Sequence, residues 1–185
     1  MPRRKRRRPA GSRRVMPATF GNLRVLVVDD NSHMRTLLRS LLQSLGVREV
    51  FETSDGAQAF AVTREFRPDF IVTDLTMEPI DGIELTRMVR TRKDSPNPFV
   101  PIIMVTGHTE RSRVEAARDA GVTEFIAKPI TAQNLTARIN TITERPRPFV
   151  RCDSYVGPDR RRRRAEDFEG PWRRHDDPEK DVDIS

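Results

Sequence analysis

Short apolar runs alternate with stretches of helical periodicity between residues 23 and 143. Runs such as Leu23–Val28 are apolar at almost every position, which is typical of strands buried on both faces. Between the runs, apolar residues recur at every third or fourth position, as they do from Met34 to Leu45. The predicted strands are Leu23–Val28, Glu49–Thr53, Phe70–Thr73, Pro101–Thr106 and Glu124–Ala127, and the predicted helices cover residues 34–46, 55–66, 82–92, 110–121 and 131–143. This strict alternation predicts an α/β fold, with a parallel sheet covered on both faces and right-handed crossovers.

The pattern ends near Glu144. Pro146 and Pro148 follow, then an arginine-rich stretch and an acidic end with few aliphatic residues. Such a segment predicts no regular helix or sheet in isolation. We therefore divide the chain into a basic arm over residues 1–20, a folded domain over 21–145 and an arginine-rich tail over 146–185 that a ligand would order.

The net charge of +7 is unevenly distributed over the 185 residues. Residues 1–14 carry eight basic residues and no acid, whereas residues 15–150 carry 17 of each sign. The folded domain is therefore close to neutral, and the high isoelectric point describes the arm. Such an arm either binds a polyanion or is a solvated start of the chain. Charged residues make up 33% of the sequence and apolar residues only 36%, which predicts that part of it stays unpacked.

Cysteine content and hydropathy favour the cytoplasm. Cys152 is the only cysteine, so no disulfide within the chain is possible. No apolar run approaches the ~20 residues that span a bilayer, and no apolar segment follows the basic start as it does in a secretory signal. We therefore expect a cytoplasmic protein without membrane insertion.

Polar residues follow the predicted strands where each strand ends. Asp29 and Asp30 follow the first strand, Asp74 the third, Thr106 ends the fourth and Lys128 follows the fifth. The carboxyl ends of parallel strands meet at one edge of a sheet, where ligands of doubly wound folds bind. Carboxylates that meet there repel each other unless a divalent cation and a lysine neutralise them. Such an oxygen-rich site suits Mg²⁺.

Residues 22–143 resemble the receiver domain of bacterial two-component response regulators, the CheY-like family. The resemblance is carried by the acid pair in VVDDNS, Asp74 in VTDLTMEPIDG, Thr106 in MVTGHT and Lys128 in FIAKPI, all in the expected order. It implies a five-stranded flavodoxin/CheY-like sheet of order 2-1-3-4-5. It also implies a non-enzymatic signalling protein that takes part in phosphorelay signal transduction and has a sensor histidine kinase as its partner.

The same resemblance assigns the phosphoacceptor and the metal ligands. Asp74 would accept the phosphoryl group, because a carboxylate is a competent nucleophile for this transfer. Asp30 and Asp74 would bind Mg²⁺ with the backbone carbonyl of Thr76, and Asp29 would act through water. The cation and the lysine would neutralise the charge that spreads over the phosphoryl oxygens.

Three further residues receive roles from the resemblance. Lys128 would contact the phosphoryl oxygens, Thr106 would turn to hydrogen-bond them, and Phe125 would follow that motion inward. The Lys128–Pro129 peptide is expected to be cis. Two alternatives stay open: a degenerate receiver that no longer accepts phosphate, and a flavin binder of the same topology, although no phosphate-binding loop rich in glycine follows the first strand.

The tail contains a duplicated pattern of an aromatic residue, a Gly-Pro turn and an arginine pair. Gly-Pro forces a bend, tandem guanidinium groups suit phosphate and the O6/N7 edge of guanine, and aromatic rings suit base stacking. The first copy consists of Tyr155, Gly157, Pro158, Arg160 and Arg161, and the second of Phe168, Gly170, Pro171, Arg173 and Arg174.

Two similar copies suggest a ligand with two similar halves or two ligand molecules stacked together. Cyclic di-GMP has two guanines and two phosphates. The tail resembles the arginine-rich extension of a group of CheY-like proteins, the Cle proteins, which bind this nucleotide. We therefore expect residues 151–174 to bind it. Arg151 would contribute a guanidinium group, Trp172 would stack on a guanine, and Asp159 would accept a hydrogen bond from one. By the same resemblance, the protein partner would be the flagellar motor switch, which links the chain to chemotaxis.

Two other functions remain open. The arm and the tail could hold nucleic acid, which predicts a steep dependence of binding on salt. Alternatively, the chain could be a phosphorelay shuttle whose tail has no part in its output.

Overall fold

A five-stranded parallel sheet forms the centre of the protein. The structure, a computed structural model, describes residues 20–107, 111–152 and 155–159. The sheet strands are β1 (Arg24–Val28), β2 (Glu49–Thr53), β3 (Phe70–Asp74), β4 (Ile102–Thr106) and β5 (Glu124–Ala127). Their order is β2-β1-β3-β4-β5, and every neighbouring pair is parallel. The predicted α/β fold and strand order are confirmed.

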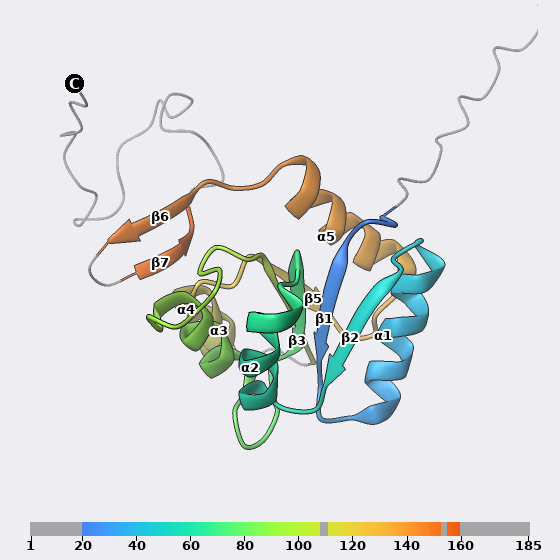
Figure 1. Cartoon of the computed structure of the whole chain (residues 1–185), viewed down its shortest axis with the longest axis horizontal. Coiled ribbons are helices and arrows are strands. Elements are labelled where there is room, and N and C mark those ends of the chain that lie inside the picture. Colours follow the sequence, from blue (N-terminus) through green and yellow to red (C-terminus); the bar gives the residue numbers. More distant parts are fainter. Residues whose placement is uncertain (1–19, 108–110, 153–154, 160–185) are drawn as a thin grey trace, which may run out of the picture.

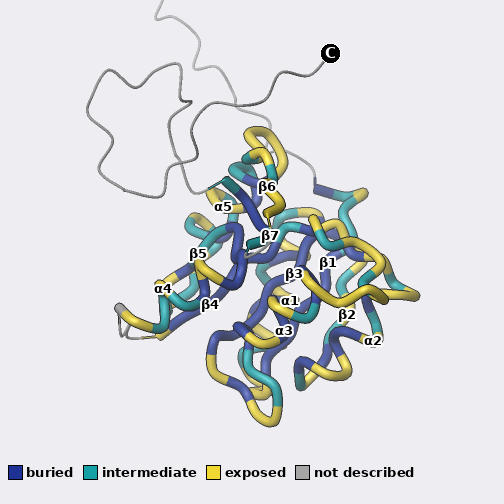
Figure 2. The backbone as a smooth tube through the Cα atoms, turned by 90° about the vertical axis from the view of Figure 1, so that its left-hand side faces the viewer, coloured by how far each residue is buried: buried dark blue, intermediate teal, exposed yellow. Residues whose placement is uncertain are grey.

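Five helices cover the sheet in two layers. They are α1 (Ser32–Ser44), α2 (Gly56–Phe66), α3 (Gly82–Thr91), α4 (Arg111–Ala120) and α5 (Ala132–Glu144). Leucines of α1 pack with Leu135 and Ile139 of α5 on one face, and α2 and α3 share a second cluster on the other. A third cluster joins α4 to α3. Figure 1 shows this division into layers, and Figure 2 shows the buried strands between them.

Local capping fixes where the helices begin and end. Asn31, directly after the acid pair, is the N-cap of α1 and accepts hydrogen bonds from the backbone N–H of His33 and Met34. Thr131 caps α5 in a reciprocal capping box with Asn134. Gly121 follows α4 with a φ of 99°, a conformation that favours glycine.

An antiparallel hairpin follows α5. Its strands are β6 (Phe149–Cys152) and β7 (Tyr155–Pro158). We expected no regular structure after Glu144 without a ligand, and for these residues that expectation was wrong. Isolated two-stranded hairpins are marginal in water, but β7 packs against α3 and α4, so the folded domain supplies the contacts that the tail lacks. In Figure 1 the hairpin lies beside these helices, at the end of the sheet opposite the carboxyl ends of the strands.

The close packing behind Asp74 generates a stability prediction. A Cβ at Gly82 would lie 2.2 Å from the backbone oxygen of Asp74, which cannot move aside, whereas a Cβ at Gly107 would meet no described atom within 4 Å. We expect Gly82→Ala to lower the free energy of unfolding by about 1–3 kcal/mol through overpacking. Gly107→Ala is the control, because both substitutions change the unfolded chain alike. Urea denaturation measures both, and equal stabilities would contradict this account.

Candidate functional site

The strand register brings four of the predicted site residues to one edge of the sheet. Val28 pairs with Thr73, so Asp29 and Asp74 follow at adjacent strand ends. Thr106 pairs with Ala127, which places Lys128 beside it, and the backbone N–H of Lys128 donates to the Thr106 carbonyl at 2.8 Å. Parallel pairing therefore assembles an acidic pocket from residues far apart in the sequence.

Asp74 is nearly buried and is held at both carboxylate oxygens. The ammonium nitrogen of Lys128 lies 2.8 Å from Oδ1, and the backbone N–H of Thr76 donates to Oδ2 at 3.2 Å. These contacts fix the orientation of the carboxylate and supply one positive charge beside it. The Lys128–Pro129 peptide is cis, as expected.

Asp29 is the buried member of the acid pair. Its Oδ1 accepts a hydrogen bond from the Asn31 N–H at 2.9 Å, while its Oδ2 is buried and has no hydrogen-bond partner in the part of the chain that the structure describes. Burial raises the pKa of the Asp29 carboxyl above its usual range, and the charges of Asp74 and Asp30 raise it further, against the lowering effects of the Asn31 hydrogen bond and of Lys128. A buried carboxylate oxygen with no donor is a group that a cation would satisfy.

The chemistry of this pocket fits Mg²⁺. Among the described residues, no three acidic, histidine or cysteine side chains converge as a ready-made metal cluster. Mg²⁺ does not require one, because it keeps several waters and is usually held by one or two carboxylates. Asp29, Asp30 and Asp74 are the residues that would hold the ion, together with the carbonyl of Thr76.

Thr106 and Phe125, the two predicted switch residues, lie on the neighbouring strands β4 and β5. The Thr106 hydroxyl is buried and has no hydrogen-bond partner among the described residues. Phe125 is half-buried against the cluster that includes Ala117 of α4 and Met104 of β4.

Sequence reasoning missed a positioning arginine on α1. Nη1 of Arg35 donates to the backbone carbonyls of Asp29 at 2.7 Å and of Asp30 at 3.2 Å. Glu52 of β2 lies 3.6 Å from Nε of the same guanidinium group. The arginine therefore holds the backbone of the acid pair in place. Its position in the first half of the helix after the pair is the only sequence signal, and that signal alone is weak.

The first copy of the tail repeat acts as a docking element. The Tyr155 hydroxyl donates to the Pro158 carbonyl at 2.8 Å. Gly157 and Pro158 belong to strand β7, so the bend predicted for the first Gly-Pro pair was wrong. A Cβ at Gly157 would lie 2.8 Å from Cα of Gly121, and a Cβ at Gly121 would lie 2.5 Å from the Val156 oxygen. Two glycines therefore permit the close approach of β7 to the end of α4.

A buried arginine lies beneath the hairpin. Arg90 of α3 is only 1% exposed and donates to the carbonyls of Gly121 at 3.1 Å and of Pro98 and Val100 at 2.8 Å each. Its guanidinium carbon lies 5.1 Å from the centre of the Phe149 ring. Burial lowers the pKa of Arg90 to about 10. The hairpin thus covers a cation whose hydrogen bonds go to backbone carbonyls.

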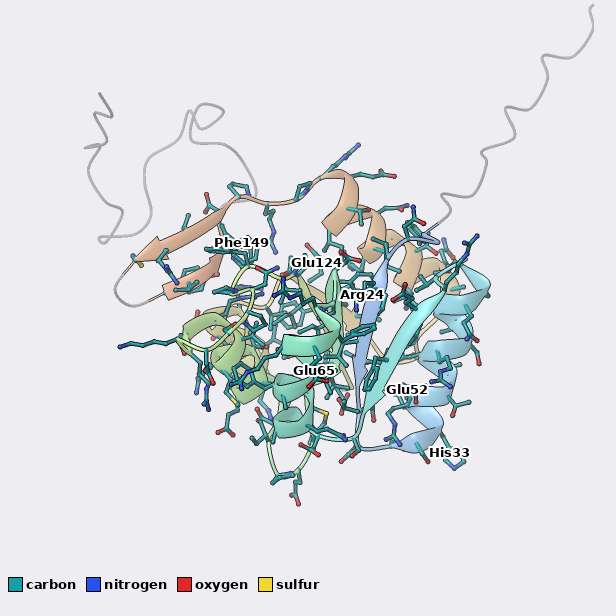
Figure 3. All side chains as sticks on the ribbon, in the orientation of Figure 1. Arg24, His33, Glu52, Glu65, Glu124 and Phe149 are labelled. Atoms are coloured by element: carbon teal, nitrogen blue, oxygen red, sulfur yellow. The ribbon has the colours of Figure 1, made fainter. Side chains whose placement is uncertain are left out.

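Arg147 ties the start of the hairpin to β5. Its guanidinium group donates to the Thr123 carbonyl and to the Asp159 carbonyl, the latter at 3.4 Å, and lies 3.5 Å from the Glu124 carboxylate. Figure 3 shows Glu124 and Phe149 near this end of the molecule and Glu52 and His33 toward the other. The hairpin and the acidic pocket therefore lie at opposite ends of the sheet.

The structure brings together only part of the predicted tail site. Arg151, Tyr155, Gly157, Pro158 and Asp159 belong to the hairpin or directly follow it. The other predicted contacts lie outside the described residues: Arg160, Arg161, Phe168, Gly170, Pro171, Trp172, Arg173 and Arg174.

Comparisons with known proteins agree with the fold. The family model for the response regulator receiver domain matches residues 25–140. The chemotaxis protein CheY of Pseudomonas aeruginosa is 38% identical over 100 residues, which cover 54% of this chain and 79% of that protein. The chemotaxis protein CheY-3 of Vibrio cholerae is 36% identical over 101 residues, covering 55% and 76%.

Solved structures give the same result. A response regulator described as putative, from Chloroflexus aurantiacus, superimposes with a TM-score of 0.61 at 29% identity and covers 66% of this chain and 98% of its own. The receiver domain of the sensor histidine kinase PA1611 of Pseudomonas aeruginosa has a TM-score of 0.58 at 30% identity, covering 64% and 94%, and holds a magnesium ion in its active-site cleft.

The chain belongs to the response regulator receiver domain family. Its relatives in that family include chemotaxis proteins of the CheY type, which places it among proteins of two-component signalling. Within the described residues, no helix combines the length and the apolar character needed to cross a bilayer.

Because the Asp29 carboxylate is buried with one oxygen unsatisfied among the described residues, replacing it should affect stability and metal binding in opposite directions. Asp29→Asn removes a buried charge, so the free energy of unfolding of the metal-free protein should rise by on the order of 1 kcal/mol at neutral pH. Because the pKa of Asp29 is raised, the native carboxyl is ionised only above that raised value, and the stability gain should disappear as the pH falls through it.

Asp30→Asn is the matched control for this prediction, because Asp30 is exposed. Both variants should lose Mg²⁺ affinity in calorimetry, but only the change at position 29 should stabilise the metal-free protein. Equal unfolding free energies for the two variants would contradict the account.

Proposed function

We propose that this protein is a single-domain response regulator that accepts a phosphoryl group on Asp74 and binds cyclic di-GMP through its tail to control a protein partner. The single observation that supports phosphoryl acceptance is the environment of Asp74, whose carboxylate lies 2.8 Å from the Lys128 ammonium and at the strand end next to the unpaired Thr106 hydroxyl. It is a signalling protein rather than an enzyme, and its phosphodonor would be a sensor histidine kinase in the cytoplasm.

Phosphoryl transfer requires a nucleophile, a leaving group and positive charge that neutralises the phosphoryl oxygens. An oxygen of Asp74 forms a bond to phosphorus while the phosphorus–nitrogen bond of the donor histidine breaks, and the electron pair of that bond stays on the imidazole nitrogen, which takes a proton. Lys128 moves from the carboxylate to an oxygen of the new phosphoryl group. Bound Mg²⁺ would supply additional positive charge for the phosphoryl oxygens.

Phosphorylation would change the positions of side chains on β4, the strand next to Asp74, and on β5. The Thr106 hydroxyl gains an acceptor when a phosphoryl oxygen arrives, so the side chain turns toward Asp74. Phe125 then follows into the space next to β4, and the α4–β5–α5 surface changes. Because β7 packs on α4 and Arg147 binds Glu124 of β5, this same surface contacts the base of the tail.

The tail supports the nucleotide proposal through its duplicated pattern, although the two copies differ in function. In the first copy, Gly157 and Pro158 are used for docking on α4, which leaves Arg151, Asp159, Arg160 and Arg161 as its ligand contacts. The second copy has Trp172 where the first has Asp159, which offers a base a larger stacking face. Docking of the hairpin shortens the segment that the ligand must order, and this lowers the entropic cost of binding.

The controlled partner is proposed to be the flagellar motor switch. Support comes from the resemblance of the tail to the Cle group and from relatives that are chemotaxis proteins. A second candidate, binding of nucleic acid, is favoured by the eight basic residues in residues 1–14.

The phosphorylation proposal is tested by intact mass spectrometry with acetyl phosphate and Mg²⁺. The wild type should gain the mass of one phosphoryl group, and Asp74→Asn should gain none. Asp94→Asn is the control, because Asp94 is an exposed carboxylate that pairs with Arg92 away from the pocket, and it should react as the wild type does. Equal labelling of Asp74→Asn and the wild type would refute the assignment.

The nucleotide proposal is tested by isothermal titration calorimetry with cyclic di-GMP. Trp172→Ala and Arg173→Ala should each weaken binding by about tenfold or more, the usual effect of one lost base stack or charged contact. Arg48→Ala, on the exposed surface before β2, should bind as the wild type does. No binding by the wild type, or equal binding by all variants, removes the tail assignment. Tight binding of a random oligonucleotide with a steep salt dependence would support the second candidate instead.

A further inference from the structure

We propose that Phe99, a residue of the receiver domain rather than of the tail, stacks one guanine base of the nucleotide, with Arg151 beside it. This inference rests on the proposed function, since it assigns part of the site for the same ligand. We call Phe99, Phe149 and Arg151 the aromatic shelf. It lies in the turn between α3 and β4 and on the adjoining strand β6.

Phe99 is exposed without a role in the core. Its side chain is 46% exposed, although it lies between Pro98 and the buried Val100. Phe149 of the hairpin contacts this ring in a T-shaped arrangement, with 5.6 Å between ring centres and 83° between ring planes, and Phe99 stays partly exposed. The folded protein thus presents a large apolar ring to solvent right beside the base of the tail.

The backbone that carries the Phe99 ring is held in place by two hydrogen bonds, and the ring itself contacts Phe149. The Asn97 side chain accepts a hydrogen bond from the Phe99 N–H at 3.0 Å, and Val100 N–H donates to the Asn97 carbonyl at 3.3 Å. Phe149 is in turn fixed from the other side by the guanidinium group of buried Arg90. A stacking surface fixed before binding loses little conformational entropy when a base arrives.

Arg151 gives the shelf its chemical preference. Its guanidinium carbon lies 5.9 Å from the centre of the Phe99 ring, near the outer limit of a cation–π contact. Arg151 has no ion-pair partner within the described part of the chain. A planar base can take the place of this guanidinium group on the Phe99 ring. The weak cation–π contact is then replaced by stacking of the base on the ring. The displaced guanidinium group of Arg151 then lies beside the base, where it can donate hydrogen bonds to the O6 and N7 atoms of guanine.

The other aromatic rings with arginine neighbours do not offer this combination. Phe60 has two guanidinium groups nearby, but its ring is buried. Phe66 has Arg24 above it, and that arginine is paired with Glu49. Phe51 is 44% exposed but contacts Phe66 and lies under no guanidinium group in the described structure. Within the described residues, the shelf alone joins an exposed ring to an arginine without an ion-pair partner.

The test compares cyclic di-GMP affinity, by calorimetry, of the wild type, Phe99→Leu, Phe99→Tyr and Phe51→Leu in the full chain. Leucine keeps apolar contact with Phe149 but has no stacking face, so Phe99→Leu should bind about tenfold more weakly. Tyrosine keeps the face and should bind as the wild type does. Phe51→Leu controls for loss of an exposed ring elsewhere.

A second measurement does not depend on a variant. In the wild type, NMR resonances of the Phe99 ring should shift when the nucleotide is added, through the ring current of the stacked base, while those of Phe51 stay in place. The amide resonances of Val156 and Gly157 report whether the hairpin stays docked in Phe99→Leu.

The outcomes separate the two proposals. If the wild type binds the nucleotide but Phe99→Leu binds it equally well and the Phe99 resonances do not shift, the shelf assignment is wrong and the tail assignment stands. If the wild type does not bind at all, the proposed nucleotide function fails, and the shelf has no ligand of this class.

Discussion

Repulsion between carboxylates at one edge of a parallel sheet is the constraint on which the rest of this structure depends. Parallel strands deliver Asp29 and Asp74 to adjacent ends, and burial of Asp29 removes the water that would screen the two charges. Lys128 offsets part of the repulsion, and the backbone of the acid pair is held by Arg35. The pocket therefore suits more positive charge, and the carboxylate of Asp74 is oriented by contacts at both oxygens.

At the opposite edge of the sheet, the hairpin covers the guanidinium group of a buried arginine. Arg90 fills space at the end of α3 and satisfies three backbone carbonyls, but it leaves a guanidinium face that needs an aromatic or polar cover. Phe149 supplies that cover, and the pair of Gly121 and Gly157 lets the second strand approach closely. A tail that is too polar to fold alone thus becomes ordered over its first residues because the receiver domain provides a complementary surface.

The fold and the pocket were largely predictable from the sequence, whereas the hairpin was not. Strand periodicity, the stop at Gly46 and the N-cap at Thr131 are local signals, and the structure agrees with them within a few residues. The pocket followed from where the strands end. The hairpin depends on contacts between Tyr155–Pro158 and α3 and α4, which lie more than 30 residues away in the sequence and leave no periodic signal. For the same reason, the roles of Arg35 and Phe99 became visible only once their neighbours in space were known.

The placement of the hairpin has a consequence for access to the acidic pocket. The acidic pocket with Asp74 lies at the carboxyl edge of the sheet, while the hairpin packs at the other edge. The described part of the tail therefore does not cover the pocket, so any effect of the hairpin on Asp74 has to pass through the body of the domain.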